Sequence, residues 1–339
     1  MKSRLPEPES SMAVTDSEVP GVIVGAPLPS AAQIHQSALE TLETKQLTQL
    51  QLAWMRFRRH HLAMAGAAIL LFMVLMAIFA PIISPEDIYN PMSADVFHAA
   101  DKAPTLSQGL RYIFGADYNG RSIAAEIMYG ARYSLLIGFT SAIFASLIGI
   151  IIGATAGYFG GWVDSVLMRL VDVFLALPFL PVLLVAVAIF GHGHASVFLV
   201  ILIFAFFGWA FVARLLRASF LPLRNAEYTE AARAVGVSNV RIMFRHMLPN
   251  ALRPILVATT LAVAGNIIAE AAIDFLGIGL QYPDTSWGSI LSAAENDPAG
   301  FSGAPWVTIY PGVFLVLTIV AVNFVGDGLS DALDVRTKL

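Results

Sequence analysis

Cysteine is absent from this chain of 339 residues. Its absence excludes disulfide bonds, thiol nucleophiles and metal sites built from cysteine. Charged side chains are also scarce, because they make up 13% of the residues, whereas a soluble domain carries about 25%. Hydrophobic residues make up 57%, and the mean hydropathy is +0.71. These values indicate a membrane protein with several spans.

Lysine is rare, and its placement limits the chemistry of the chain. No lysine follows a glycine, so none completes the Gly-Lys-Ser/Thr core of a phosphate-binding P-loop (Lys2, Lys45, Lys102 and Lys338). The patterns His-Glu-x-x-His and Gly-x-Ser-x-Gly are missing as well. We therefore expect a chain that is not an enzyme, that binds no cofactor or metal itself, and that has no nucleic-acid partner.

The N-terminal region differs in composition from the rest. Residues 1–53 are rich in Pro, Ser, Gln and Glu, which is typical of disordered segments. The region contains no apolar core between a basic start and a small-residue cleavage site, so we expect no cleaved signal peptide. Residues 33–59 have the composition of a helix that would lie near the membrane. We interpret 1–53 as a disordered cytosolic tail.

Long apolar runs locate the membrane spans. They lie at 62–85, 133–163, 173–213, 254–280 and 309–326. The third run is about twice as long as one bilayer crossing at about 1.5 Å per residue, and the glycine-rich turn at 191–194 divides it. The sequence thus predicts an all-α membrane protein with six transmembrane helices.

Basic residues are distributed unevenly between the two sides of these spans. When six spans alternate, 16 of the 20 Lys and Arg residues fall on one side. Because basic loops stay in the cytosol, we expect both termini and the segment 214–253 to be cytosolic. The resulting regions are an N-terminal segment with the first span (54–85), an extracytoplasmic loop (86–133), the core with five spans (134–326) and a cytosolic tail (327–339).

A polar segment at 225–250 interrupts the apolar core. Asn225 is a good N-cap for a first helix, and Gly236 falls where a left-handed C-cap is needed. Ser238 can cap a second helix, which we expect to stop before Pro249 because proline lacks a backbone donor. Such a pair suits either an amphipathic linker on anionic lipid or a surface gripped by another protein. Each helix has a small apolar face, made by Ala231, Ala232 and Val235 in the first and by Val240, Met243 and Phe244 in the second.

The order of residues in this segment favours the second interpretation. It resembles the EAA loop of permeases of ATP-binding-cassette (ABC) importers, a surface that docks into a groove of the ATPase subunit. His246 stands where that pattern often has isoleucine. The matching residues are Glu230, Ala231, Ala232, Gly236, Leu248 and Pro249.

The resemblance covers nearly everything after residue 54, and it is to the C-type permeases of the dipeptide/oligopeptide/nickel branch. Ala116, Ser122 and Val335 depart from the residues usual in that branch. The stretches that resemble it are 54–85, 114–121, 129–135, 230–249, 269–279, 286–288 and 323–336.

The resemblance implies a fold of six helices with a cytosolic coupling loop, in the inner membrane of a bacterium. The implied partners are membrane lipid, a second and homologous permease subunit, two ABC ATPase subunits that bind ATP and Mg²⁺, and an extracytoplasmic substrate-binding protein. The chain would form half of the pore for dipeptides or oligopeptides. ATP binding would then turn the permeases from inward-open to outward-open through the coupling loop.

Two carboxylates lie inside the expected fifth span. Glu270 and Asp274 are four residues apart and share one face of a helix; Asp274 stands where the family usually has a small residue. A charge in mid-bilayer costs at least about 2.5 kcal/mol on insertion scales, so both side chains should face the bundle or a wet cavity. Either they line the translocation path, or they are protonated or bonded to neighbouring helices. They also fit an alternative function, a proton-coupled secondary transporter, although the chain shows no convincing internal repeat.

Four smaller features are assigned a structural role, and for two of them a functional role is also open. The histidines of the turn (His192 and His194) form either a polar turn or a metal site. The loop 281–305 and its aromatic neighbours provide an interfacial anchor or a contact with a binding protein (Trp287, Trp306 and Tyr310). Charges near the third span are paired or solvated (Asp164, Arg169 and Asp172). The glycines of the second span permit close helix packing (Gly138, Gly149, Gly153 and Gly157).

Overall fold

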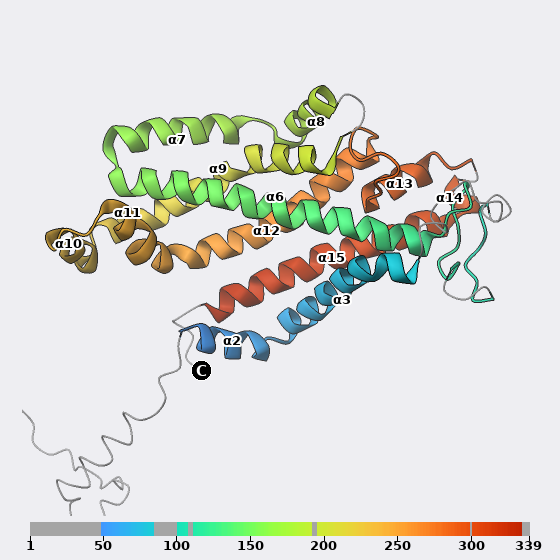
Figure 1. Ribbon diagram of the computed structural model, residues 1–339, viewed down its shortest axis with the longest axis horizontal. Helices are drawn as coiled ribbons and strands as arrows, with labels where there is room; N and C mark the ends of the chain where they lie inside the picture. Colours follow the sequence, from blue (N-terminus) through green and yellow to red (C-terminus); the bar gives the residue numbers. More distant parts are fainter. Residues whose placement is uncertain (1–48, 85–99, 108–110, 192–194, 299, 334–339) are drawn as a thin grey trace, which may run out of the picture. The chain divides into compact units, whose positions relative to one another are not determined.

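The computed structural model describes residues 49–84, 100–107, 111–191, 195–298 and 300–333. The chain divides into two compact units, Met1–Thr48 and Gln49–Leu339, and every described residue belongs to the second (Figure 1). The elements are α2 (Gln49–Arg59), α3 (His61–Ile83), α6 (Ile123–Phe159), α7 (Gly161–Ala176), α8 (Phe179–Gly191), α9 (Val197–Arg224), α10 (Glu227–Ala234), α11 (Asn239–Arg241), the π-helix η1 (Ile242–Met247), α12 (Leu248–Phe275), α13 (Trp287–Glu295), α14 (Gly300–Gly303) and α15 (Pro305–Ala332). The described residues form no strand, only an isolated antiparallel bridge between Ala116 and Ser122. The all-α expectation is confirmed.

The described residues contain five helices that are long and apolar enough to cross a membrane. They are α3, α6, α9, α15 and the continuous helix Asn239–Phe275, which ends in α12. The expected third span is instead a broken pair, because α7 and α8 meet at an angle of 85°. Leu177 at the break has an extended backbone (φ −73°, ψ 133°), since the ring of Pro178 disfavours a helical conformation in the residue before it.

The most extensive helix contact joins α6 to α9, which lie side by side (Figure 1). Along this contact a Cβ atom added to Gly149, Gly153 or Gly157 would lie 2.7, 2.5 or 2.5 Å from atoms of α9. At Gly138 it would lie 2.4 Å from the side chain of Ile267 in α12. The expected role of these glycines in close packing is therefore confirmed.

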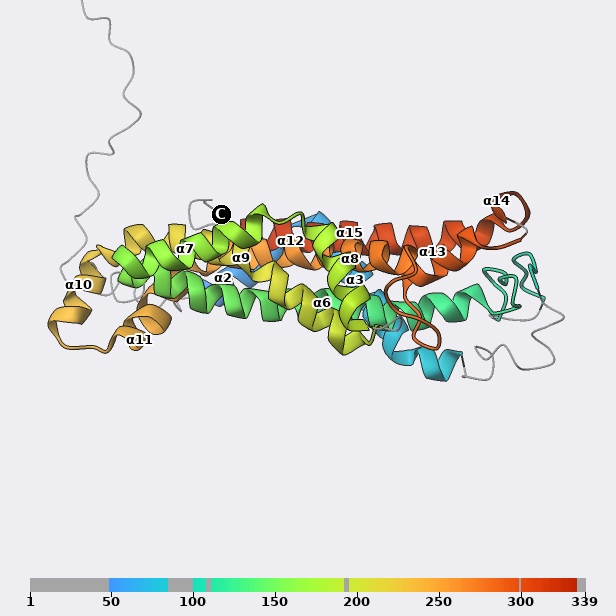
Figure 2. The same cartoon turned by 90° about the horizontal axis from the view of Figure 1, so that it is seen from above.

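The remaining long helices pack around this pair. α12 contacts α6, α9 and α15, while α3 and α2 pack against α15. Figure 2 shows α10 and α11 at one end of the helices and α13 and α14 at the other. We refer to these as the α10 end and the α13 end.

Three helices extend beyond the expected boundaries. α2 begins at Gln49, within the segment 1–53 expected to be disordered but also within the stretch 33–59 expected to form a helix, and its Gln, Leu and Ala residues favour a helix that packs on α15. α6 begins at Ile123, within the expected loop, and α15 continues to Ala332, within the expected tail. Charged residues misled the boundary prediction, because Arg132 and Asp327 were taken as the limits of the apolar runs and both lie inside these helices.

The aromatic residues near the α13 end are more deeply placed than an interfacial anchor. Trp287 is fully buried, and its Nε1 donates a hydrogen bond to the Ile127 carbonyl at 3.2 Å. Trp306 donates to the Ala116 carbonyl at 3.0 Å, and Tyr310 stacks on a phenylalanine of the loop before α6. The anchor interpretation is wrong for Trp287, because its ring fills space between α6 and α13.

Substitution of Gly153 tests the α6–α9 contact. We expect Gly153→Val to lower the thermal midpoint of the purified protein in detergent, with a loss of stability of about 1–3 kcal/mol from overpacking. Gly265→Val is the matched control, because a Cβ at Gly265 meets nothing within 4 Å. Equal midpoints for the two variants would show that α6 and α9 do not need this close approach.

Candidate functional site

The short helix α10 leaves α9 by a tight turn at the α10 end. Asn225 does not cap α10, as expected from the sequence, but ends α9 as its C-cap (φ −102°, ψ 11°). Ala226 precedes α10 and forms no side-chain capping bond. Buried Thr229 anchors the helix instead, because its hydroxyl donates a hydrogen bond to the Leu223 carbonyl at 2.8 Å. The direction of α10 is thus set by the end of α9.

Gly236 ends α10 in the left-handed conformation predicted from the sequence. Its φ is +80°, and its amide donates to the Arg233 carbonyl at 3.0 Å. The amide of Val237 donates to the Ala232 carbonyl at 3.0 Å. This pair of bonds is a Schellman motif. Since a Cβ at Gly236 would meet nothing within 4 Å, the glycine is required by the backbone conformation and leaves the outer surface open.

The second helix of the segment does not stop before Pro249. Residues 239–275 form one continuous helix, in which η1 passes directly into α12. Pro249 directly follows the C-cap of η1, Leu248, whose amide donates five residues back to the Met243 carbonyl, so the missing amide hydrogen of Pro249 falls where the helix changes from π-type to α-type bonding. The wider π-turn also changes which residues share a face: Met243 is buried and Val240 and Phe244 are exposed, so the expected single apolar face is wrong.

The exposed surface of this end is apolar and small-residue rich. Val235 is 84% exposed and Val240 is 63% exposed, and large apolar side chains so open to solvent indicate an interaction surface. The rest of the surface comes from partly exposed rings (Tyr228 and Phe244). Of the predicted docking residues, four are exposed (Glu230, Ala231, Gly236 and Pro249) and two are half-buried (Ala232 and Leu248). We call this set, with Tyr228, Val235, Val240 and Phe244, the coupling surface.

The coupling surface is fixed to α6. The Tyr158 hydroxyl of α6 donates a hydrogen bond to Asn239 Oδ1 at 2.7 Å, and the Arg233 guanidinium lies over the Tyr158 ring at 5.1 Å from its centroid. Ile242 and Met247 are fully buried against α9 and α12 residues. A force on α10 or η1 therefore reaches α6 and α12 without passing through a flexible linker.

Glu270 and Asp274 form the centre of a second, buried polar cluster. Glu270 is 0% exposed and Asp274 is 2% exposed. Ser134 of α6 donates a hydrogen bond from its hydroxyl to Glu270 Oε1 at 3.3 Å, and it accepts one from the Trp287 amide at 3.3 Å. The carboxylate of Glu270 thus belongs to a junction of α6, α12 and α13 rather than to an exposed wall.

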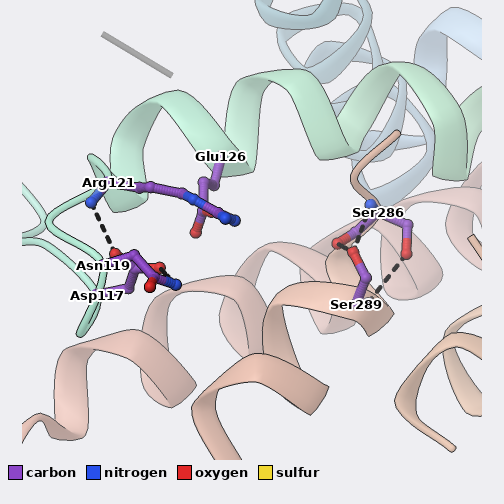
Figure 3. A network of polar contacts seen from close by, with 6 residues as sticks. All are labelled: Asp117, Asn119, Arg121, Glu126, Ser286 and Ser289. Atoms are coloured by element: carbon purple, nitrogen blue, oxygen red, sulfur yellow. Dashed lines mark hydrogen bonds and ion pairs between the residues drawn. The ribbon is translucent and has the colours of Figure 1, made fainter. Parts of the chain in front are cut away.

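Asp274 fastens the segment after α12. Its Oδ1 accepts a hydrogen bond from the Leu280 amide at 2.8 Å, and its Oδ2 accepts one from the Ser286 hydroxyl. Gly279 makes room for this arrangement, because a Cβ there would lie 1.6 Å from Asp274 Oδ1. Ser286 in turn caps α13 through reciprocal bonds with Ser289 (Figure 3). We call these contacts the Asp274 clasp.

A third network lies where α6 begins (Figure 3). Asp117 Oδ1 accepts a hydrogen bond from the Arg121 amide at 2.7 Å, and the Asn119 amide group donates to its Oδ2 at 3.4 Å. The Arg121 guanidinium lies 3.4 Å from Glu126 Oε1. Burial raises the pKa of Asp117 above its ordinary range, and the hydrogen bonds and charge of Arg121 oppose this rise.

The other candidate residues have structural roles or lie outside the described residues. Asp164 of α7 accepts two hydrogen bonds from the Arg217 guanidinium, at 2.6 and 3.0 Å, and Asp172 pairs with Arg214. Both acids are paired, as expected. The histidine pair at 192 and 194 lies outside the described residues.

Two family models match the chain. One is described as binding-protein-dependent transport system inner membrane component and matches residues 145–339, which is more than half of the chain. The chain belongs to this family. The other is described as the N-terminal TM domain of oligopeptide transport permease C and matches residues 48–104.

Similar proteins are permeases of several transport systems. The dipeptide transport system permease protein DppC of Bacillus subtilis is 36% identical over 299 residues, which cover 88% of this chain and 89% of that protein. The oligopeptide transport system permease protein OppC of the same organism is 36% identical over 310 residues, covering 91% and 96%. The glutathione transport system permease protein GsiD of Pectobacterium atrosepticum is 36% identical over 285 residues, covering 84% and 90%. The permease interpretation therefore holds over the proton-coupled carrier.

Several residues that organise these permease sites were missed in the sequence. Ser134, Gly279 and Ser286 lie in stretches that resemble the permease family, but no role was predicted for them. Ser134 is 136 positions from its partner Glu270, and the resemblance does not identify that partner. The polar start of α6 was also missed, because Glu126 was counted as part of a loop.

A double-mutant cycle tests the Asp274 clasp. Gly279→Ala alone should displace the Asp274 carboxylate and lower the thermal midpoint of the permease, and Asp274→Ala alone should lower it by removing two acceptors. We expect the double variant to lose less stability than the sum of the two, because the clash disappears with the carboxylate. Gly312→Ala, at a site with open space for a Cβ, should be additive with Asp274→Ala. Additivity in both pairs would contradict the clasp.

Proposed function

We propose that this chain is one of two transmembrane subunits of an ATP-driven importer of small peptides. The observation that carries the proposal is the coupling surface, where Val235 and Gly236 stand open at the end of α10 while the helices behind them are tied to α6 and α12. An exposed apolar surface on a rigid support is what a docking subunit requires. The relatives named for dipeptide and oligopeptide systems support the same function.

The proposed assembly has four partners besides lipid. A second, homologous permease completes the pore, two ABC ATPase subunits dock at the two coupling surfaces, and an extracytoplasmic substrate-binding protein delivers the solute. ATP and Mg²⁺ bind to the ATPases, and this chain binds no cofactor. The docking residues of this chain are Glu230, Ala231, Ala232, Gly236, Leu248 and Pro249.

We propose that the α10 end faces the cytosol of a bacterium and that both termini lie on that side of its inner membrane. Arginine is concentrated at this end: Arg214, Arg217 and Arg224 lie in the last turns of α9, and further arginines follow on α10, α11 and η1. Basic residues favour the cytosolic side. The α13 end then faces outwards.

We propose different roles for the two intramembrane carboxylates, Glu270 and Asp274. Glu270 is enclosed by α6, α12 and α13 and holds these helices together. Asp274 lines one side of a polar pocket at the α13 end, and it keeps the proposed position beside the path of the solute. Motion from the ATPases would reach both residues along α12, because the helix is continuous from η1 to Phe275.

Two substitutions test the coupling surface. Gly236→Val puts a β-branched residue at a positive φ, at a cost of about 1–2 kcal/mol or more in local backbone energy, and Ala232→Glu adds a charge to a close contact. We expect either variant to reduce the ATPase recovered with the tagged permease by about tenfold or more and to abolish peptide uptake. Membrane insertion should be unchanged.

Gly161→Val is the matched control for the backbone effect. Gly161 also has a positive φ (+56°) and open space for a Cβ, but it lies at the start of α7 outside the coupling surface. The control should retain ATPase binding. Normal ATPase recovery and uptake in both Gly236→Val and Ala232→Glu would refute the docking function.

A further inference from the structure

A polar pocket of about 280 Å³ opens at the α13 end. Its walls come from the start of α6, the end of α12, the segment 277–285 and one face of α13. The Asp274 clasp holds two of these walls in place, because it joins α12 to Leu280 and to Ser286 at the N-terminus of α13. The pocket is therefore a built feature of the fold and has the dimensions of a small-solute site.

Acidic groups outnumber basic ones in this pocket. Its lining includes three carboxylates, Glu126, Asp274 and Asp284, but a single cationic side chain, Arg121. The segment that follows strengthens the imbalance, because residues 281–308 contain three acidic residues and no Lys or Arg. The electric field of the pocket thus favours a cation.

The buried Glu126 carboxylate has one oxygen that accepts no hydrogen bond from the described residues. Its side chain is only 4% exposed, and it lines the pocket. Oε1 receives the Arg121 guanidinium at 3.4 Å, whereas Oε2 has no hydrogen-bond partner among the described residues. The same guanidinium also compensates the buried Asp117. Two buried carboxylates therefore share one cation, and a cationic ligand would supply a second partner for this pair.

The other two acids of the lining differ in their capacity to bind a ligand. Both oxygens of Asp274 already accept hydrogen bonds within the clasp. Asp284 is half-buried and interacts with the Tyr133 hydroxyl, which leaves a carboxylate with further acceptor capacity. The rings of Tyr118 and Tyr282 also line the pocket. The Arg121 guanidinium already lies over the Tyr282 ring, at 4.6 Å from its centroid, whereas the exposed Tyr118 ring favours contact with an organic cation over a hydrated metal ion.

We propose that this pocket binds the protonated amino group of a small organic solute. The ammonium donates hydrogen bonds to Glu126 Oε2 at the base and to Asp284 at the side, while the Tyr118 ring contacts the adjoining carbon atoms. A primary ammonium has three donors, which suits two carboxylates and one of the pocket hydroxyls, such as that of Ser289. The inference deepens the proposed function, since it gives the importer an amine-selective site on its outer face, and it rests on that function only for the orientation of the chain.

Direct binding to the full chain, purified with its partner subunits in lipid nanodiscs, tests the proposal without ATP or transport. The probe is the amide of alanyl-alanine, which has a free amino group and no carboxylate, and its N-acetylated counterpart is the neutral control. Isothermal titration should give saturable binding of the free amine and binding at least about tenfold weaker for the acetylated compound, as expected for loss of a charge-assisted hydrogen bond.

Three variants locate the site. Glu126→Gln and Asp284→Asn keep the size of each side chain and should each weaken amine binding by about tenfold or more. Glu295→Gln removes a charge from an exposed residue of α13 outside the pocket lining and should leave binding unchanged. A size-exclusion profile matching that of the parent protein verifies folding of each variant.

Equal binding of the acetylated compound would overturn the proposal, as would unchanged binding in both pocket variants. An equal loss in Glu295→Gln would also overturn it, because it would indicate attraction by the whole acidic face. Failure of the coupling-surface variants to release the ATPase would refute the proposed function and leave these binding results intact, so the two failures are distinguishable.

Discussion

Helices in lipid gain nothing from hiding apolar surface from one another, so close backbone approach and interhelical hydrogen bonds must hold them together. In this permease that constraint falls on α6. Glycines bring it against α9, where a Cβ would lie within 2.7 Å of the neighbouring helix. Three polar pairs join it to α12 at distances of 3.3, 2.8 and 2.8 Å (Ser134–Glu270, Ser141–Asn266 and Ser146–Thr259). A ladder of polar contacts along an apolar interface fixes the register of the two helices.

Both proposed sites of the chain depend on that register. Tyr158, in the last turn of α6, supports α10 and α11, and Glu126, in its first turn, lines the outer pocket. α6 spans 37 residues without interruption. Any rotation of α6 relative to α12 would therefore alter the coupling surface and the pocket at the same time.

The sequence predicted those features that depend on local chemistry. The apolar runs located the long helices, with α3 nearly as expected, and Gly236 in its left-handed cap followed from a helix end that needs a positive φ. Features set by distant partners were missed. Asp274 is bonded to a segment whose path depends on Gly279 and Ser286, and no local pattern reveals such a pairing. The break at Pro178 had a local signal, yet the expectation of a simple hairpin overrode it.

The continuity of η1 with α12 has a thermodynamic consequence. From Asn239 to Phe275 the chain forms a helix of 37 residues, about 55 Å long at 1.5 Å per residue, with one end at the coupling surface and the other at the Asp274 clasp. Two ligands that bias the same rigid body must influence each other equally in both directions. A solute held at the outer end would then change the affinity of the ATPase by the same factor by which the ATPase changes the affinity for solute. Binding of solute to the outer pocket would thus change the affinity of the ATPase for the permease before any ATP is hydrolysed.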